Sequence, residues 1–89
     1  MLYAWMGFLK PDAGQIPQEV QQQTSEFLSQ SFIRFAGPLR DGSGNRVGAM
    51  VIFEVDDHGQ AETFVKESPY LQAGLYRDHG LYEYANEVG

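Results

Sequence analysis

The sequence of 89 residues contains no cysteine. Disulfides, thiolate metal sites and thiol nucleophiles are therefore excluded, and the absence suits a reducing compartment. Basic residues are also scarce, because six lysines and arginines stand against twelve acidic residues, for a net charge of −6. The six are scattered along the sequence. Since nucleic-acid binding needs a basic stripe, we expect no nucleic-acid partner.

Long hydrophobic runs are missing as well. The longest covers residues 1–9, which is too short to span a bilayer. It has neither the basic region nor the small-residue cleavage site of a signal peptide. We therefore expect no membrane association and a cytoplasmic protein.

Histidine is rare, and the Gly-rich segment lacks the features of a cofactor loop. His58 and His79 are the two histidines, far apart in the sequence, so convergent metal ligands are not expected. The segment at residues 41–45 has no lysine and no strand–loop–helix context, so it does not predict a phosphate-binding loop. We expect neither a metal nor a cofactor.

The apolar content is sufficient for a folded core. Hydrophobic residues make up 43% of the chain and aromatic residues 13%, which argues against disorder. The length suits one domain, and no repeat, linker or low-complexity segment interrupts it. We expect a single domain over residues 1–89.

The first half of the chain predicts a strand, a helix and a second strand. Leu2–Leu9 is almost continuously apolar, which is typical of a buried strand, and a turn is expected at residues 10–14. Pro17 can occupy the first position of a helix, and an apolar face then recurs at helical spacing from Val20 to Ser31. Residues 32–39 are strand-like.

The second half predicts a hairpin, a helix and a last strand. The Gly-rich residues 40–45 connect to a strand over residues 47–55. Asp56 or Asp57 can cap the second helix, and Ser68-Pro69 ends it, because proline disfavours helical geometry in the residue before it. The final strand covers residues 75–85.

The element order β-α-β-β-α-β predicts a ferredoxin-like α+β plait: an antiparallel four-stranded sheet with both helices on one face. The central strands are nevertheless apolar on both faces, since Leu2, Ala4, Met6 and Phe8 alternate with equally apolar neighbours. An uncovered apolar sheet face is larger than monomers usually tolerate. We therefore predict an isologous homodimer that packs sheet to sheet.

Short motifs along almost the whole chain resemble the YciI-like (YCII-related) family of the dimeric α+β barrel group. They are the Met-Leu-Tyr start, Leu9-Lys10-Pro11, Gly37-Pro38-Leu39, Gly48-Ala49-Met50, Gln60-Ala61 and Pro69-Tyr70 through Ala73-Gly74-Leu75. The resemblance implies a homodimer and a pocket near the barrel mouth of each subunit.

The resemblance also implies which positions would carry chemistry. Members of the family have a histidine early in the first helix and an aspartate before the Pro-Tyr or Pro-Phe, a pair regarded as an acid–base dyad. At least one relative is similar to a lyase that eliminates chloride from an aromatic ring. Here the corresponding positions are Val20 and Ser68, so we expect the family fold without the family dyad.

Other polar residues remain as candidates for catalysis. His79 is either an ordinary residue of an edge strand or part of the pocket, and His58 suits a solvated helix cap. Tyr70 is either a core aromatic or a hydroxyl donor in the cleft. Ser68 could act as a nucleophile only beside a base.

For the ligand pocket, the candidates come from the first strand, from the two positions named by the resemblance and from the tyrosine that follows Pro69. They are Tyr3, Trp5, Val20, Ser68 and Tyr70. The two aromatic residues of the first strand suit a flat apolar wall, and they suit the core equally.

The sequence leaves three functions open. The first is a dimer that binds a small molecule and lacks the dyad. The second is a small cofactor-free lyase or isomerase for an aromatic or enol-type compound, with His79 and Tyr70 as its candidate acid–base pair. The third is a regulatory or partner-binding module. Whether the protein is an enzyme is not decided by these residues.

Overall fold

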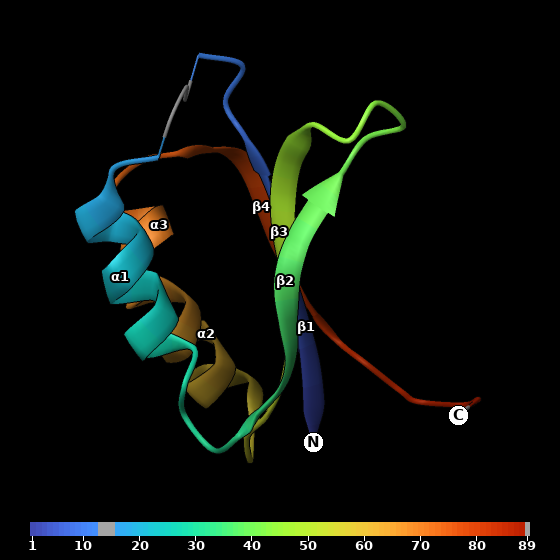
Figure 1. The fold of residues 1–89 in the computed structure, drawn as a ribbon. Helices are drawn as coiled ribbons and strands as arrows, with labels where there is room; N and C mark the ends of the chain where they lie inside the picture. Colours follow the sequence, from blue (N-terminus) through green and yellow to red (C-terminus); the bar gives the residue numbers. More distant parts are fainter. Residues whose placement is uncertain (13–15, 89) are drawn as a thin grey trace.

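The computed structural model describes residues 1–12 and 16–88, in which one sheet carries all its helices on the same side (Figure 1). The strands are β1 (Leu2–Leu9), β2 (Ile33–Arg40), β3 (Arg46–Glu54) and β4 (Tyr76–Glu83), and the helices are α1 (Gln18–Phe27), α2 (His58–Lys66) and α3 (Pro69–Gln72). The turn expected at residues 10–14 lies partly outside the described residues.

The sheet is antiparallel throughout, in the order β2-β3-β1-β4. The apolar strands β1 and β3 are therefore central, and β2 and β4 form the edges. This arrangement confirms the ferredoxin-like α+β fold. It also places every strand within a residue or two of its predicted range.

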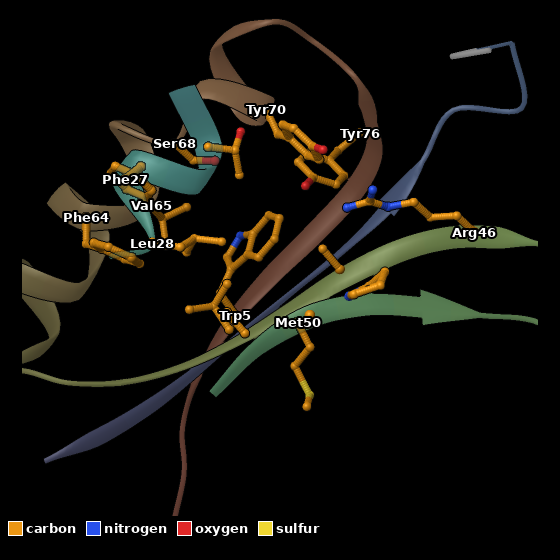
Figure 2. A pocket seen from close by; sticks show the side chains of 16 residues that line it. Trp5, Phe27, Leu28, Arg46, Met50, Phe64, Val65, Ser68, Tyr70 and Tyr76 are labelled. Atoms are coloured by element: carbon orange, nitrogen blue, oxygen red, sulfur yellow. The ribbon is translucent and has the colours of Figure 1, made fainter. Parts of the chain in front are cut away.

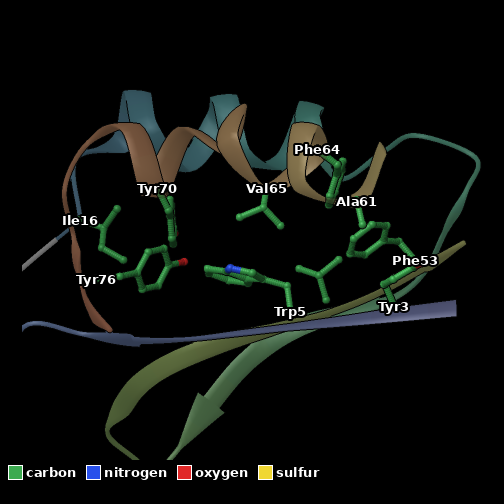
Figure 3. Packing of buried hydrophobic residues seen from close by; sticks show 10 residues of the cluster. Tyr3, Trp5, Ile16, Phe53, Ala61, Phe64, Val65, Tyr70 and Tyr76 are labelled. Atoms are coloured by element: carbon green, nitrogen blue, oxygen red, sulfur yellow. The ribbon is translucent and has the colours of Figure 1, made fainter. Parts of the chain in front are cut away.

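The core fills the space between the sheet and the helices (Figure 3). Tyr3 and Trp5 of β1 and Phe53 of β3 project toward the helices and are almost fully buried. The ring of Phe64 in α2 lies 4.4 Å from that of Phe53 and 4.6 Å from that of Phe27 in α1, centroid to centroid. Each buried aromatic side chain contributes roughly 1.5–3 kcal/mol, so these contacts hold the two layers together.

Helix α1 is shorter than the sequence predicted. It ends at Phe27, so Ser31 lies outside it. The reason is local: Ser29 Oγ donates to the carbonyl of Glu26, and Gln30 Nε2 donates to the carbonyl of Phe27. Such side chains compete with the helix for its own backbone groups.

Helix α2 begins where the sequence indicated, because Asp57 accepts a hydrogen bond from the backbone N–H of Gln60. After α2 ends, Pro69 does not start a loop but opens the short helix α3, which the sequence did not predict. Proline suits the first helical position, since the N–H that it lacks would have no partner there. Gly74 then takes a positive φ of 71° and turns the chain into β4.

The hairpin between β2 and β3 is organised by Asp41. Its Oδ1 accepts hydrogen bonds from the backbone N–H groups of Ser43 and Asn45. These bonds, the one from Asn45 first, lower the pKa of Asp41, because they stabilise the ionised form. The hairpin fixes where β3 begins, and hence where Arg46 lies.

Within residues 1–12 and 16–88, no helix covers the other face of the sheet (Figure 1), and Tyr84 and Asn86 of the C-terminal tail line a hollow on it. We call this face the open face; it presents Leu2, Ala4, Met6 and Phe8 of β1 together with Phe35 of β2 and Tyr82 of β4. Phe35 is 72% exposed. The hollow has a volume of about 560 Å³, and the ion pair between Arg34 and Glu54 stands at its rim. None of the described helices has the length and apolar character to cross a membrane.

Candidate functional site

A pocket of about 180 Å³ lies on the covered side of the sheet, between the helices and the ends of β2 and β3 (Figure 2). Each of the four strands and three helices contributes at least one residue to its walls. Its apolar wall includes Trp5, Phe27, Leu28, Phe64 and Val65. This combination of an enclosed apolar space and a few polar groups is typical of small-molecule sites.

Trp5 forms a flat wall of the pocket and is only 4% exposed. Its ring meets that of Tyr76 edge to face, with the centroids 4.9 Å apart. The indole extends over Gly7, where a Cβ atom would stand 2.5 Å from the Trp5 ring. Gly7 is therefore what allows the indole to lie close to the sheet.

Arg46, Tyr70 and Tyr76 form the polar rim of the pocket. Figure 2 shows Arg46 reaching from β3 toward the two tyrosine rings, and its guanidinium carbon lies 5.5 Å from the centroid of Tyr70. This is a cation–π distance. Burial raises the pKa of Tyr76 far above its ordinary value, Tyr70 adds to the effect and Arg46 opposes it. The Tyr76 hydroxyl therefore stays protonated and remains a hydrogen-bond donor near neutral pH.

Two hydroxyl side chains complete the lining. Ser68 is half-buried at the start of α3 and makes no side-chain capping bond, which leaves its hydroxyl available to a ligand. Thr24 of α1 has a buried Oγ1 for which the described residues supply no hydrogen-bond partner. Buried hydroxyls usually have a partner, so this atom stands out.

The residues predicted for the pocket separate into two groups. Trp5, Ser68 and Tyr70 line it. Tyr3 lies elsewhere in the core, with its ring 6.2 Å from that of Phe53, and Val20 packs half-buried against the core from α1 without lining the pocket. Burial, together with the carboxylates of Glu83 and Asp57, raises the pKa of Tyr3.

His79 lies behind the wall of the pocket. It pairs with Gly7 across the β1–β4 ladder, and its Nδ1 accepts a hydrogen bond of 3.2 Å from Trp5 Nε1. An accepting Nδ1 carries no proton, so in this arrangement the neutral ring holds its proton on Nε2. His79 does not line the pocket and does not meet Tyr70 there, and Trp5 connects it to the site.

The pocket lining contains no histidine, aspartate or glutamate among the described residues. Its ionisable groups are Arg46, Tyr70 and Tyr76, of which sequence reasoning had named only Tyr70. The position of Arg46 directly after a Gly-rich hairpin is a signal that could have found it, because strand ends often carry site residues. In the described part of the chain, no three His, Asp or Glu side chains cluster in a way that could hold a metal ion.

Comparison with known proteins agrees with the fold. The structure of 5-chloro-2-hydroxyhydroquinone dehydrochlorinase (TftG) from Burkholderia phenoliruptrix AC1100, in complex with 2,5-dihydroxybenzoquinone, is similar with a TM-score of 0.85 and 20% identity, covering 97% of this chain and 95% of that one. SnoaB from Streptomyces nogalater, a cofactor-independent oxygenase, is similar with a TM-score of 0.56 and 16% identity over 98% and 94% of the two chains.

A third structure, Rv0793 from Mycobacterium tuberculosis, gives a TM-score of 0.58 at 9% identity over 99% and 97% of the two chains. At these identities the likeness concerns the fold alone. No curated protein matches the sequence. The model of the YCII-related domain, in contrast, matches residues 1–85. The chain therefore belongs to the YCII-related family, as its motifs indicated.

Proposed function

We propose that this YCII-related protein binds a small organic molecule with a single ring in the pocket beside Trp5. The observation that carries the proposal is the size and lining of that pocket. Its volume is about 180 Å³. In another protein, an engineered apolar cavity of about 150 Å³ is enough to bind benzene. The space therefore suits one six-membered ring with small substituents.

The shape of the walls supports a planar ligand. Trp5 and Tyr76 are held edge to face, and their positions leave the indole surface toward the pocket (Figure 2). Aromatic rings in such sites pack against a flat ligand by stacking or edge contacts. The dehydrochlorinase of similar fold holds 2,5-dihydroxybenzoquinone, which is a single planar ring. This likeness adds support to the class of ligand.

We further propose that dyad chemistry of the family type is absent. Val20 and Ser68 stand at the dyad positions, and neither side chain shuttles protons at neutral pH. A positioned general base typically contributes about 10²–10⁴-fold to a rate. A binding role without this catalysis is therefore the first candidate.

The second candidate is a cofactor-free lyase or isomerase for an aromatic or enol-type compound. The hydroxyls of Ser68, Tyr70 and Tyr76 around the pocket favour it, because they could orient an enol oxygen. His79 would be the remaining histidine for proton transfer, acting from beyond Trp5. The similar folds of a dehydrochlorinase and a cofactor-independent oxygenase agree with this candidate.

The experiment is to fill the pocket. Ala36 of β2 lines the pocket and is itself exposed, so Ala36→Phe should occlude the space at little cost to folding. Binding of single-ring compounds, followed by the fluorescence of Trp5, the one tryptophan of the chain, should be lost. Ala85→Phe in the C-terminal tail is the matched control and should bind as the wild type does.

The same proteins separate the two candidates. Dechlorination and isomerisation of small aromatic enols are measured for the wild type, Ala36→Phe and His79→Ala. We expect no turnover in any of them. If the wild type turns over a substrate and both Ala36→Phe and His79→Ala abolish that turnover, the protein is an enzyme and the binding role is replaced. If Ala36→Phe binds ligand as well as the wild type does, the choice of pocket is contradicted.

We also propose that two copies pair through the open face to form a homodimer. The support is that no helix covers Ala4, Met6 and Phe35, within the described residues, on a face that is mostly apolar apart from the ion pair of Arg34 and Glu54. The fold is that of the dimeric α+β barrel group, which agrees with the proposal. The chain mass of 10.0 kDa then predicts a particle of about 20 kDa in solution.

A further inference from the structure

Four of the six basic residues gather at one end of the sheet, although they are scattered in the sequence. In the antiparallel order, β1 and β2 end where β3 and β4 begin (Figure 1). These strand ends carry Lys10, Arg40, Arg46 and Arg77. Asp12, Asp41 and Asp78 lie in or next to the same strand ends, so this basic end is only slightly positive, in a chain of net charge −6.

Arg46 connects the basic end to the pocket. It lines the pocket, and it also lines an adjoining hollow of about 360 Å³ together with Lys10 and Arg77. A negative group at the pocket mouth would therefore meet Arg46 first and would remain in the field of two more cations. A cluster of positive charges of this kind raises the local concentration of anions.

Arg46 has no carboxylate partner among the described residues. Arg34 pairs with Glu54, and Arg77 lies 3.5 Å from Asp78, but no acidic side chain of residues 1–12 or 16–88 pairs with Arg46. Arg40, moreover, lies across the ladder from Arg46. Like charges in facing strand positions are unfavourable, so an anion bound beside Arg46 would relieve the repulsion between the two arginines.

The rest of the polar lining is rich in donors. The hydroxyls of Tyr70 and Tyr76 lie beside Arg46, and Thr24 Oγ1 lacks a partner. No carboxylate lines this pocket in the described part of the chain, so nothing there repels a negative ligand. Donors arranged around a guanidinium match the oxygens of a carboxylate or an ionised hydroxyl.

We infer that the ligand is a single-ring organic anion whose acidic oxygen binds Arg46 while its ring lies against Trp5. The inference rests on the proposed binding role and names the chemical class of the ligand. A ring carboxylate, a phenolate and an enolate share this chemistry. A charge-assisted hydrogen bond is about twice as strong as a neutral one, so the charge should dominate selectivity.

The experiment compares benzoate with benzamide, which have nearly the same shape but differ in charge. Binding is followed by the ¹H–¹⁵N signal of the Trp5 indole, which is unique because the chain has one tryptophan. We expect benzoate to bind at least about tenfold more tightly than benzamide, which corresponds to about 1.4 kcal/mol. 4-Nitrophenol, whose anion has its own absorption band, extends the comparison to phenolates.

Two arginine variants locate the effect. Arg46→Gln should remove the preference for benzoate, and Arg46→Lys, which keeps the charge but not the fork of donors, should retain part of it. Arg40→Gln is the matched control: it makes the same change of net charge from the facing strand, and Arg40 does not line the pocket. It should keep the preference. Circular dichroism establishes that each variant is folded.

The outcomes separate this inference from the proposed function. Equal affinity of wild type for benzoate and benzamide would overturn the anionic class while leaving a ring-binding pocket. A preference that survives Arg46→Gln or disappears in Arg40→Gln would overturn the role of Arg46. No binding of either compound would overturn the binding role and the inference together. If only the carboxylate or only the phenolate binds, that compound identifies the source of the acidic oxygen.

Discussion

The two faces of β1 are built from similar residues and meet different surroundings. Tyr3 and Trp5 point toward the helices and are almost fully buried, while Leu2, Ala4 and Met6 point the other way and remain partly exposed. Both sets are apolar. The difference therefore comes from what covers each face and not from the strand itself.

This comparison shows that burial is a property of the layer arrangement. A sheet with one wet face normally alternates polar and apolar residues along its strands, and β1 does not. On the covered face the apolar residues form the core and the pocket. On the open face the same kind of residue is left for a second layer, which is why we propose a second copy there.

The largest expected effect is a charge on the covered face. Val51 of β3 is 7% exposed within the core, and Val51→Asp places a carboxylate there without a partner. We expect the free energy of unfolding to fall by several kcal/mol, which is a large part of the ~5–15 kcal/mol typical of a whole domain. Thermal unfolding measures it, and Val51→Thr, of similar shape but uncharged, should lose less. An unchanged melting temperature for Val51→Asp would show that β3 is placed wrongly.

A charge on the open face should separate subunits before it unfolds them. Ala4 lies at the centre of that face, between Ile52 of β3 and Tyr82 of β4 in the ladder. Ala4→Asp should reduce the particle in light scattering from about 20 kDa to the 10.0 kDa of one chain, with a normal circular dichroism spectrum. Ala4→Ser is the uncharged control. A wild type that is already monomeric at micromolar concentration would end the dimer proposal.

The smallest expected effect is a loss of folding stability at alkaline pH, caused by Tyr76 on the covered face. Because burial raises the pKa of Tyr76 in the folded state, its contribution to stability is complete below the unfolded pKa of about 10 and is lost as pH rises above it. The free energy of unfolding should fall there by up to about 1.4 kcal/mol per pH unit through this residue. Tyr76→Phe should flatten that decline in urea unfolding between pH 9 and 11, and an equal slope would argue against the burial of its hydroxyl.

Much of the fold could be predicted because its signals are local. The apolar run Leu2–Leu9 and the cap at Asp57 depend on neighbouring residues, and both are as the sequence indicated. The end of α1 depends on competing local bonds, because Ser29 and Gln30 close that helix early. Ser68-Pro69 predicts only the end of α2, and the structure shows that Pro69 also opens α3.

The site depends more on contacts between residues far apart in the sequence, and a local sequence pattern does not predict such contacts. Trp5 and Tyr70 could be named because strand alternation and an element junction mark them, and Ser68 because the family resemblance assigns a dyad position to it. Tyr76 carries no such mark. Arg46 is marked by its place directly after the Gly-rich hairpin, but its meeting with Tyr76 requires β3 and β4 to begin at the same end of the sheet. The basic end could not be predicted for the same reason, because its four residues come from four different strand ends that meet only in the folded sheet.

The missing side chain at Gly7 has a consequence for the width of the pocket beside Trp5. Glycine within a strand costs roughly 0.5–1 kcal/mol relative to alanine, so the position gives up stability. In return the Trp5 ring settles into the space where a Cβ would be. Any side chain there would lift the indole toward the helices and narrow the pocket. The width of the pocket is thus set from beneath the tryptophan, at Gly7, which does not line the pocket itself.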